Sequence, residues 1–181
     1  KIGAKKNYFF DRKTEIKKIE KKIQYQISKN QDFIEYSEKG INYLKEISQM
    51  IKKNMGGLLL IDYGYVDKKM KNTLQAVSNH KFSNILENLG DSDITHNINF
   101  NLFEKIVKNE GGLKSELTNQ KKFLTKMGIE ERAEIISKKE KFLKKVDIYS
   151  RLQRLINEKQ MGNLFKVMLI KNKKNTFKLG F

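Results

Sequence analysis

The chain has 181 residues, 38% of them hydrophobic, and this length fits one domain with a modest core. It carries 38 lysines and arginines against 21 acids, a net charge of +17, with no cysteine and only two histidines, His80 and His96. These counts exclude a disulfide scaffold, a cysteine nucleophile and a cysteine- or histidine-rich metal centre. We expect no membrane span and no signal peptide, because long apolar runs are missing. The chain begins at Lys1, so we expect that an upstream part is missing.

The positive charge is unevenly distributed. Residues 1–56 carry a net +7, residues 57–110 a net −1 and residues 111–181 a net +11. Only 4 of the 38 basic residues are arginines, whereas phosphate and base recognition favours the arginine fork. We therefore expect most of the lysines to lie on the solvated surface. We do not expect a nucleic-acid-binding site. A basic binding module remains the alternative.

The first third of the chain predicts a strand–helix–strand unit. Residues 16–27 have apolar positions that fit either a helix or a strand and loop, and residues 33–36 are typical of a short strand. Ser37 offers an N-cap for a helix that repeats apolar residues up to Ile51. The run 58–61 is uninterruptedly apolar, as in a parallel strand buried on both faces. The unit would have a right-handed crossover.

The rest of the chain alternates between polar and periodic segments. Residues 66–100 are polar and weakly periodic, which indicates a functional excursion. After it we expect a helix over 100–107, a strand over 113–117, two or three helices over 123–146 that break at Gly128 and near Lys138, a helix over 152–156 and a strand over 165–170.

Candidate site residues follow the two predicted strands. Ligands of open α/β sheets lie outside the carboxyl ends of the strands, and Glu35 and Asp62 stand at two such ends. Tyr63 and Gly64 follow, and glycine would let the backbone turn close to a ligand. The alternative is that Asp62 caps a turn and Tyr63 covers the sheet edge.

Other candidates are weaker. His80 and His96 could be acid–base groups, although lone histidines in polar loops are more often surface residues. Asp91 and Asp93 could hold a metal, but such pairs more commonly make Asx turns, and we expect no metal site. A glycine-rich dinucleotide fingerprint is absent from the sequence.

A collinear set of motifs carries a family resemblance over residues 32–181. The chain resembles the C-terminal portion of the MidA / mitochondrial complex I assembly factor 7 family of S-adenosylmethionine-dependent methyltransferases. The matching pieces are Gly56 to Tyr65, Thr73 to Val77 with His80, Asp93 to Thr95 with Asn99-Phe100, Gln120 with Phe123-Leu124 and Gly128-Ile129, and Met161-Gly162 with Leu164 to Val167.

The resemblance implies an α/β fold: the C-terminal part of a Rossmann-like methyltransferase sheet with a mainly helical elaboration. Residues 33–36 would be the fourth strand and 58–61 the fifth, while 113–117 and 165–170 would be the last two. We accordingly divide the chain into the C-terminal half of the core (1–65), a mainly helical elaboration with substrate-side loops (66–160), and a closing strand with a tail (161–181).

The resemblance also implies the cofactor and the substrate. The cofactor would be S-adenosyl-L-methionine, but the family's glycine-rich loop and the acid that closes its second strand would lie upstream of Lys1. The mitochondrial member dimethylates an arginine of a complex I subunit, so this chain would be a fragment of a protein-arginine N-methyltransferase linked to complex I assembly. The alternative is a non-catalytic scaffold that binds RNA or a complex I subunit. The location would be the bacterial cytoplasm or the mitochondrial matrix.

The resemblance also implies roles for individual residues. Glu35 and Asp62 would be the acids that orient a cationic guanidinium and relieve its proton. Tyr63, Gly64, His80, Asp93 and Thr95 would form the substrate side, and the family's usual aspartate before Phe100 is Asn99 here. We expect the chain alone to be inactive, to bind no S-adenosylmethionine and to associate, as a possible homo-oligomer, through an exposed sheet edge.

Overall fold

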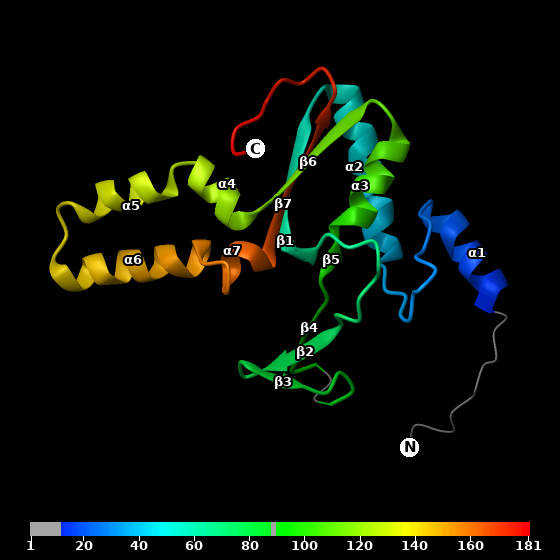
Figure 1. The fold of residues 1–181 in the computed structure, drawn as a ribbon, viewed down its shortest axis with the longest axis horizontal. Coiled ribbons are helices and arrows are strands. Elements are labelled where there is room, and N and C mark those ends of the chain that lie inside the picture. Colours follow the sequence, from blue (N-terminus) through cyan, green and yellow to red (C-terminus); the bar gives the residue numbers. More distant parts are fainter. Residues whose placement is uncertain (1–11, 88–89) are drawn as a thin grey trace.

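The computed structural model describes residues 12–87 and 90–181 (Figure 1). Its helices are α1 (Arg12–Ile23), α2 (Glu38–Asn54), α3 (Phe100–Glu110), α4 (Gln120–Lys126), α5 (Ile129–Ser137), α6 (Phe142–Ile156) and α7 (Met161–Leu164). Its strands are β1 (Gly57–Tyr65), β2 (Gln75–Ser78), β3 (Lys81–Ser83), β4 (Asp93–Thr95), β5 (Ile98–Asn99), β6 (Leu113–Asn119) and β7 (Phe165–Asn172). The fold is mixed α/β, as predicted.

A four-stranded mixed sheet in the order β5-β1-β7-β6 forms the centre. Strand β7 pairs antiparallel with β1 from Gly57↔Lys171 to Tyr63↔Phe165, and antiparallel with β6 on its other side. Only β5 runs parallel to β1. Strand β7 lies between β1 and β6, and its Val167, Met168 and Ile170 are 0% exposed. A separate antiparallel sheet has the order β3-β2-β4.

Helices α2 and α3 cover one face of the four-stranded sheet (Figure 1). Helix α2 begins as the sequence predicts, because the Ser37 hydroxyl accepts a hydrogen bond from the Gly40 amide. It ends when Met55, not a glycine, takes the left-handed conformation at φ 56°. Ile41, Leu44 and Ile51 of α2 share a buried cluster with residues of α1, α3 and the sheet.

The opposite face of the sheet is covered unevenly. Side chains alternate along a strand, so Leu58 and Leu60 face the helices while Leu59, Ile61 and Tyr63 face the other way and stay 45%, 45% and 42% exposed. Lys171 lies on this second face, is 2% exposed, and pairs with Glu116 at 3.2 Å. Burial tends to raise the pKa of Glu116, but the hydrogen bond and charge of Lys171 outweigh it and hold that pKa below its usual value.

A helical arm is inserted between β6 and β7. Asn119 and Lys166 are paired at the end of the β6–β7 ladder, and helices α4 to α7 occupy the connection between them. The arm therefore projects from the end of the sheet at which β1 finishes (Figure 1). Its own small core is made by Ala133, Leu152 and Ile156, which are buried between α5 and α6.

Several predicted elements need correction. Residues 33–36 form no strand, so the βαβ unit with its right-handed crossover is absent, although 58–61 and 165–170 lie in strands β1 and β7 as predicted. Strand β1 is not buried on both faces. Residues 152–156 belong to α6 and are not a separate helix.

The proposed division into 1–65, 66–160 and 161–181 stays a prediction. Residues 1–11 of its first part lie outside the described residues. Its second part, which was expected to be mainly helical, contains strands β2 to β6 besides helices α3 to α6. The three-stranded sheet was missed because its strands span only three or four residues each.

Substitution of Gly64 by alanine tests the close contact between β1 and β5. A Cβ atom at Gly64 would lie 2.5 Å from both the Ile98 carbonyl oxygen and a ring carbon of Phe100, whereas one at Gly56 would meet nothing within 4 Å. We expect Gly64→Ala to lower the free energy of unfolding by about 1–3 kcal/mol through overpacking, and Gly56→Ala to change it by less than about 0.5 kcal/mol. Urea unfolding of both variants measures this, and equal midpoints would contradict the packing described.

Candidate functional site

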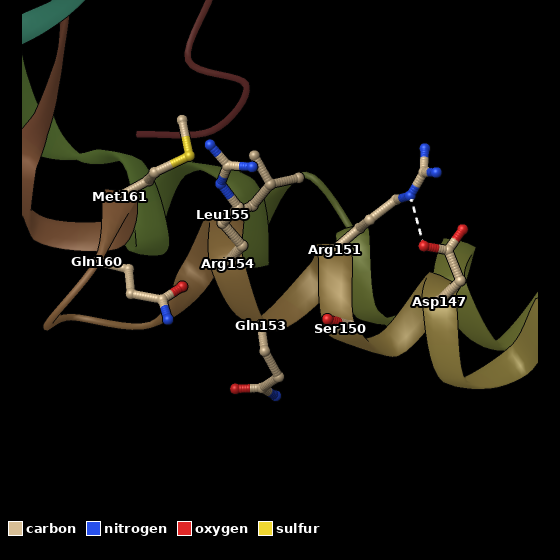
Figure 2. A pocket seen from close by; sticks show the side chains of 8 residues that line it. All are labelled: Asp147, Ser150, Arg151, Gln153, Arg154, Leu155, Gln160 and Met161. Atoms are coloured by element: carbon tan, nitrogen blue, oxygen red, sulfur yellow. Dashed lines mark hydrogen bonds and ion pairs between the residues drawn. The ribbon is translucent and has the colours of Figure 1, made fainter. Parts of the chain in front are cut away.

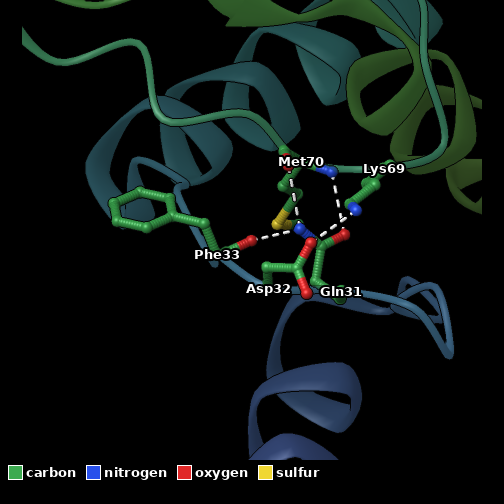
Figure 3. A network of polar contacts seen from close by, with 5 residues as sticks. All are labelled: Gln31, Asp32, Phe33, Lys69 and Met70. Atoms are coloured by element: carbon green, nitrogen blue, oxygen red, sulfur yellow. Dashed lines mark hydrogen bonds and ion pairs between the residues drawn. The ribbon is translucent and has the colours of Figure 1, made fainter.

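The linker between α1 and α2 is bound to the loop that follows β1. Gln31 is the first anchor: its Nε2 donates to the Met70 carbonyl at 2.8 Å and its Oε1 accepts from the Met70 amide at 2.9 Å (Figure 3). Lys69 Nζ also lies 2.6 Å from Asp32 Oδ2. These bonds hold the extended segment 31–37 beside residues 69–74, at the carboxyl end of β1.

Glu35 is the second anchor of the same loop. Its Oε2 accepts from the amides of Thr73 and Leu74, both at 3.1 Å, and its Oε1 accepts from the Thr73 hydroxyl. The Thr73 oxygen in turn accepts from the Asn97 amide at 2.8 Å. We call Glu35, Thr73, Leu74 and Asn97 the carboxylate junction. It explains why 33–36 is not a strand: Glu35 binds a loop instead of extending the sheet.

Tyr65 and Lys71 lie next to the carboxylate junction. Tyr65 is buried, its hydroxyl accepts from the Lys71 amide at 3.1 Å, and Lys71 Nζ lies 5.1 Å from its ring centroid. Burial raises the pKa of Tyr65 and the negative charge of Glu35 adds to this, while Lys71 opposes it. The carboxyl end of β1 thus combines a carboxylate, a phenol and an ammonium group.

Asp62 lies inside β1, not after it, because the strand continues to Tyr65. Its Oδ1 accepts from the Tyr63 amide at 2.8 Å, and Lys166 is its partner on β7. The Tyr63 ring packs on Phe165 with centroids 4.3 Å apart, so Tyr63 does cover part of the sheet end. Gly64 is buried opposite Ile98 and allows β5 to come close. Glu35 and Asp62 are therefore held by different partners.

The remaining predicted residues lie in the three-stranded sheet. His80 occupies the exposed turn between β2 and β3, where Asn79 and His80 have φ of 50° and 61°, as in a type I′ hairpin. Asp93 and Thr95 lie in β4, and the Thr95 hydroxyl accepts from Gln75 Nε2 at 3.1 Å. Thr95 lies close to the carboxylate junction in two ways. It stands two residues before Asn97, and its partner Gln75 directly follows Leu74. His80 stands at the far end of β2 from that junction.

Asn99 replaces the acid that the resemblance led us to expect. It is buried, and its Oδ1 accepts from the Leu102 amide at 3.2 Å, which caps the N-terminus of α3. Its Nδ2 is buried without a hydrogen-bond partner in the described chain. Asn99 therefore stabilises the N-terminus of α3 in this structure.

Two cavities do not coincide with the predicted site residues. An open groove of about 800 Å³ runs along α6 to α7 and is lined by polar and charged side chains, among them Arg154 and the Arg151–Asp147 ion pair at 3.0 Å (Figure 2). A smaller cavity of about 250 Å³ borders the loop after β1 and is lined by Tyr25, Lys68 and Asn101, among others. It is below the roughly 300–1,000 Å³ of ordinary ligand pockets.

The described residues do not form a cradle for a nucleotide-like cofactor. Open α/β folds hold nucleotides with a glycine-rich turn between a strand and a helix. Strand β1 is instead followed by the loop 66–74 and strand β2. Glu35, the carboxylate beside that loop, already accepts hydrogen bonds from Thr73 and Leu74. We therefore derive no cofactor-dependent step from these residues.

Comparison with known proteins identifies the family. The model of the family described as "Putative S-adenosyl-L-methionine-dependent methyltransferase" matches residues 5–118. The chain belongs to this family. The cofactor of this family is S-adenosyl-L-methionine, which agrees with the cofactor that the resemblance implied.

Curated relatives agree with this family. Protein arginine methyltransferase NDUFAF7, mitochondrial, from Xenopus tropicalis is 26% identical over 136 residues, which is 75% of this chain and 31% of that protein. The NDUFAF7 homolog from Caenorhabditis elegans is 32% identical over 89 residues, covering 48% of this chain and 21% of that protein. The chain spans about a third of the length of its Xenopus relative.

Solved structures share the fold. An uncharacterized superfamily protein from Burkholderia thailandensis matches with a TM-score of 0.72 at 21% identity, over 96% of this chain and 46% of that one. A second member from the same organism, described as a candidate methyl transferase and bound to S-adenosyl-homocysteine, matches with a TM-score of 0.64 at 21% identity, over 78% and 38%. The Rossmann-like methyltransferase architecture is thus confirmed as the fold.

In residues 12–87 and 90–181, no three histidine or acidic side chains gather as a metal site would require. None of the helices described has the length and apolar character needed to cross a bilayer.

Sequence reasoning missed the partners that hold Glu35. Thr73 and Asn97 form the carboxylate junction, and Tyr65 and Lys71 lie beside it. Thr73 does begin one of the family motifs, which was a usable signal. Asn97 contributes only its backbone amide, which no residue pattern can reveal.

Thr73→Val tests the carboxylate junction. The variant keeps the side-chain shape but removes the hydroxyl that links Glu35 to the Asn97 amide. We expect a loss of about 1 kcal/mol in stability and faster hydrogen exchange at the Asn97 amide, which loses its acceptor. Thr125→Val, at an exposed position of α4, is the matched control. Unchanged exchange at Asn97 in Thr73→Val would show that the junction is not formed.

Proposed function

We propose that the whole protein is a protein-arginine N-methyltransferase and that this chain supplies the substrate-side wall of its active site. The family assignment and the names of the NDUFAF7 relatives support the reaction class. Because the chain spans only about a third of its Xenopus relative, we place the cofactor-binding loops in the part of the whole protein that this chain does not cover. The chain alone would then be inactive.

The observation that carries this proposal is the carboxylate of Asp62, which lies in β1 three residues before the strand ends. Asp62 Oδ1 accepts from the Tyr63 amide, while no partner for Oδ2 is found within the described residues. A guanidinium group is cationic and has only donors, so a free carboxylate oxygen is a suitable acceptor for it. Asp62 would orient the guanidinium and relieve its proton.

Glu35 would have a supporting role in the same site. Its oxygens already accept from Thr73 and Leu74, so it positions the loop after β1 and adds negative charge near Tyr65. Tyr63, Gly64, His80, Asp93 and Thr95 complete the proposed substrate side. The three-stranded sheet that carries His80, Asp93 and Thr95 follows directly from that loop.

The proposed substrate is a protein, because the relatives are named as protein arginine methyltransferases. A subunit of respiratory complex I fits the resemblance seen in the sequence. The vertebrate relatives are named as mitochondrial, which supports a matrix location, and a bacterial homologue would act in the cytoplasm. The exposed Leu59 and Ile61 support association with a further surface, such as a second copy.

The experiment uses the whole protein with S-adenosylmethionine labelled at the methyl group and candidate protein substrates. Asp62→Asn should lower kcat by about a hundredfold, because an amide cannot take a proton. Asp147→Asn, an exposed carboxylate of α6 paired with Arg151, is the control and should leave kcat unchanged. Undiminished activity of Asp62→Asn would remove Asp62 from the site, and label on residues other than arginine would overturn the substrate class.

A further inference from the structure

The tip of the helical arm exposes large apolar side chains. We define the arm tip as residues 135–146, the end of α5, the turn and the start of α6. Phe142 and Leu143 are 77% and 80% exposed, and Ile135, Ile136 and Val146 are 67%, 45% and 50% exposed. Burying such side chains would be favourable, so a group of this kind at one end of a projection indicates a contact surface.

Lysines surround these apolar side chains. The arm tip contains Lys138, Lys139, Lys141, Lys144 and Lys145 against a single acid, Glu140, a net charge of +4. Glu140 is paired with Lys144 at 3.4 Å, and most of the other lysine side chains are exposed. The tip is therefore both apolar and strongly basic.

The arm holds its tip at a distance from the rest of the fold. Helices α5 and α6 pack together through Ala133, Leu152 and Ile156, and nearer the tip Ser137 Oγ lies 3.3 Å from Tyr149 Oη. Beyond it the chain turns at residues 138–141, at the end of the arm in Figure 1. The tip is a convex end, not a groove.

This combination favours a lipid surface over other anionic partners. RNA recognition uses arginine forks and stacked aromatic rings, whereas the tip has lysines only and a single aromatic ring. Aliphatic side chains among lysines suit the boundary between acyl chains and anionic headgroups, where each lysine near the surface contributes about 1 kcal/mol. A convex apolar end can enter a deformable bilayer without a preformed groove.

We propose that the arm tip binds the surface of anionic phospholipid bilayers, with Phe142 and Leu143 inserted at the headgroup boundary and the tip lysines against the lipid phosphates. The contact is peripheral and does not span the membrane. It is independent of the proposed methyltransferase activity, because none of its residues belongs to the proposed active site.

Flotation of the chain with lipid vesicles tests this proposal. The chain should float with vesicles of phosphatidylglycerol and phosphatidylcholine but not with phosphatidylcholine alone, and salt should weaken the binding. Phe142→Ser/Leu143→Ser should reduce binding by about tenfold or more, because two inserted side chains are lost. Flotation separates bound protein from any aggregate, which sediments.

Matched controls separate the tip from general stickiness and charge. Phe82→Ser/Leu86→Ser removes a pair that is equally exposed, at 79% and 71%, but lies in and after β3. Lys138→Gln/Lys139→Gln/Lys141→Gln is compared with Lys173→Gln/Lys174→Gln/Lys178→Gln, which removes the same charge from the C-terminal tail. Only the tip variants should lose vesicle binding. The midpoint of thermal unfolding should be unchanged in the tip and control variants.

Three results would overturn the proposal. The first is no flotation of the original chain with anionic vesicles. The second is an equal loss of binding in tip and control variants, which would indicate non-specific adsorption. The third is tight binding to a single-stranded RNA that Lys138→Gln/Lys139→Gln/Lys141→Gln abolishes while vesicle binding remains, which would identify the tip as an RNA surface.

Discussion

The antiparallel ladder between β1 and β7 is the constraint on which the rest of the structure depends. It joins residues 57–63 to residues 165–171, two segments separated by most of the chain. Met168 and Ile170 of β7 are completely buried and belong to the core that α2 and α3 cover. Since β6 pairs with the other edge of β7, the arm between them must leave from one end of the sheet. That end also holds the carboxylate junction and the proposed substrate side.

The same ladder explains why the chain offers one wall of a site and not a closed pocket. Within the described residues, β1 pairs on its other edge only at Gly64 and Tyr65, with β5. Its Leu59 and Ile61 remain exposed on the face away from α2 and α3. A strand with this apolar pattern is typical of the interior of a larger sheet. The family assignment and the partial coverage of the relatives fit that interpretation.

Sequence patterns predicted the elements that depend on interactions between residues close together in the chain. The Ser37 cap, the apolar spacing of α2 and the presence of strands at 58–61 and 165–170 were predicted correctly, because capping and apolar runs are visible in the sequence. The burial of 58–61 on both faces was not. The segment 33–36 was predicted wrongly: Ile34 and Tyr36 do pack on the core, but Glu35 accepts hydrogen bonds from the Thr73 and Leu74 amides of a distant loop. The buried Lys171 was also unpredictable, since its partner Glu116 comes from another strand. Backbone partners and cross-strand ion pairs exist only once the topology is formed.

In the proposed function the chain carries the substrate side of a methyltransferase, and the cradle for the cofactor lies elsewhere in the whole protein. Calorimetric titration of the purified 181-residue chain with S-adenosylmethionine tests it most directly, with the whole protein as the comparison. The account predicts saturable binding by the whole protein and none by the chain. Saturable binding by the chain with a Kd near about 1 μM, roughly −8 kcal/mol, would show that the cofactor site lies within these residues and would contradict the account.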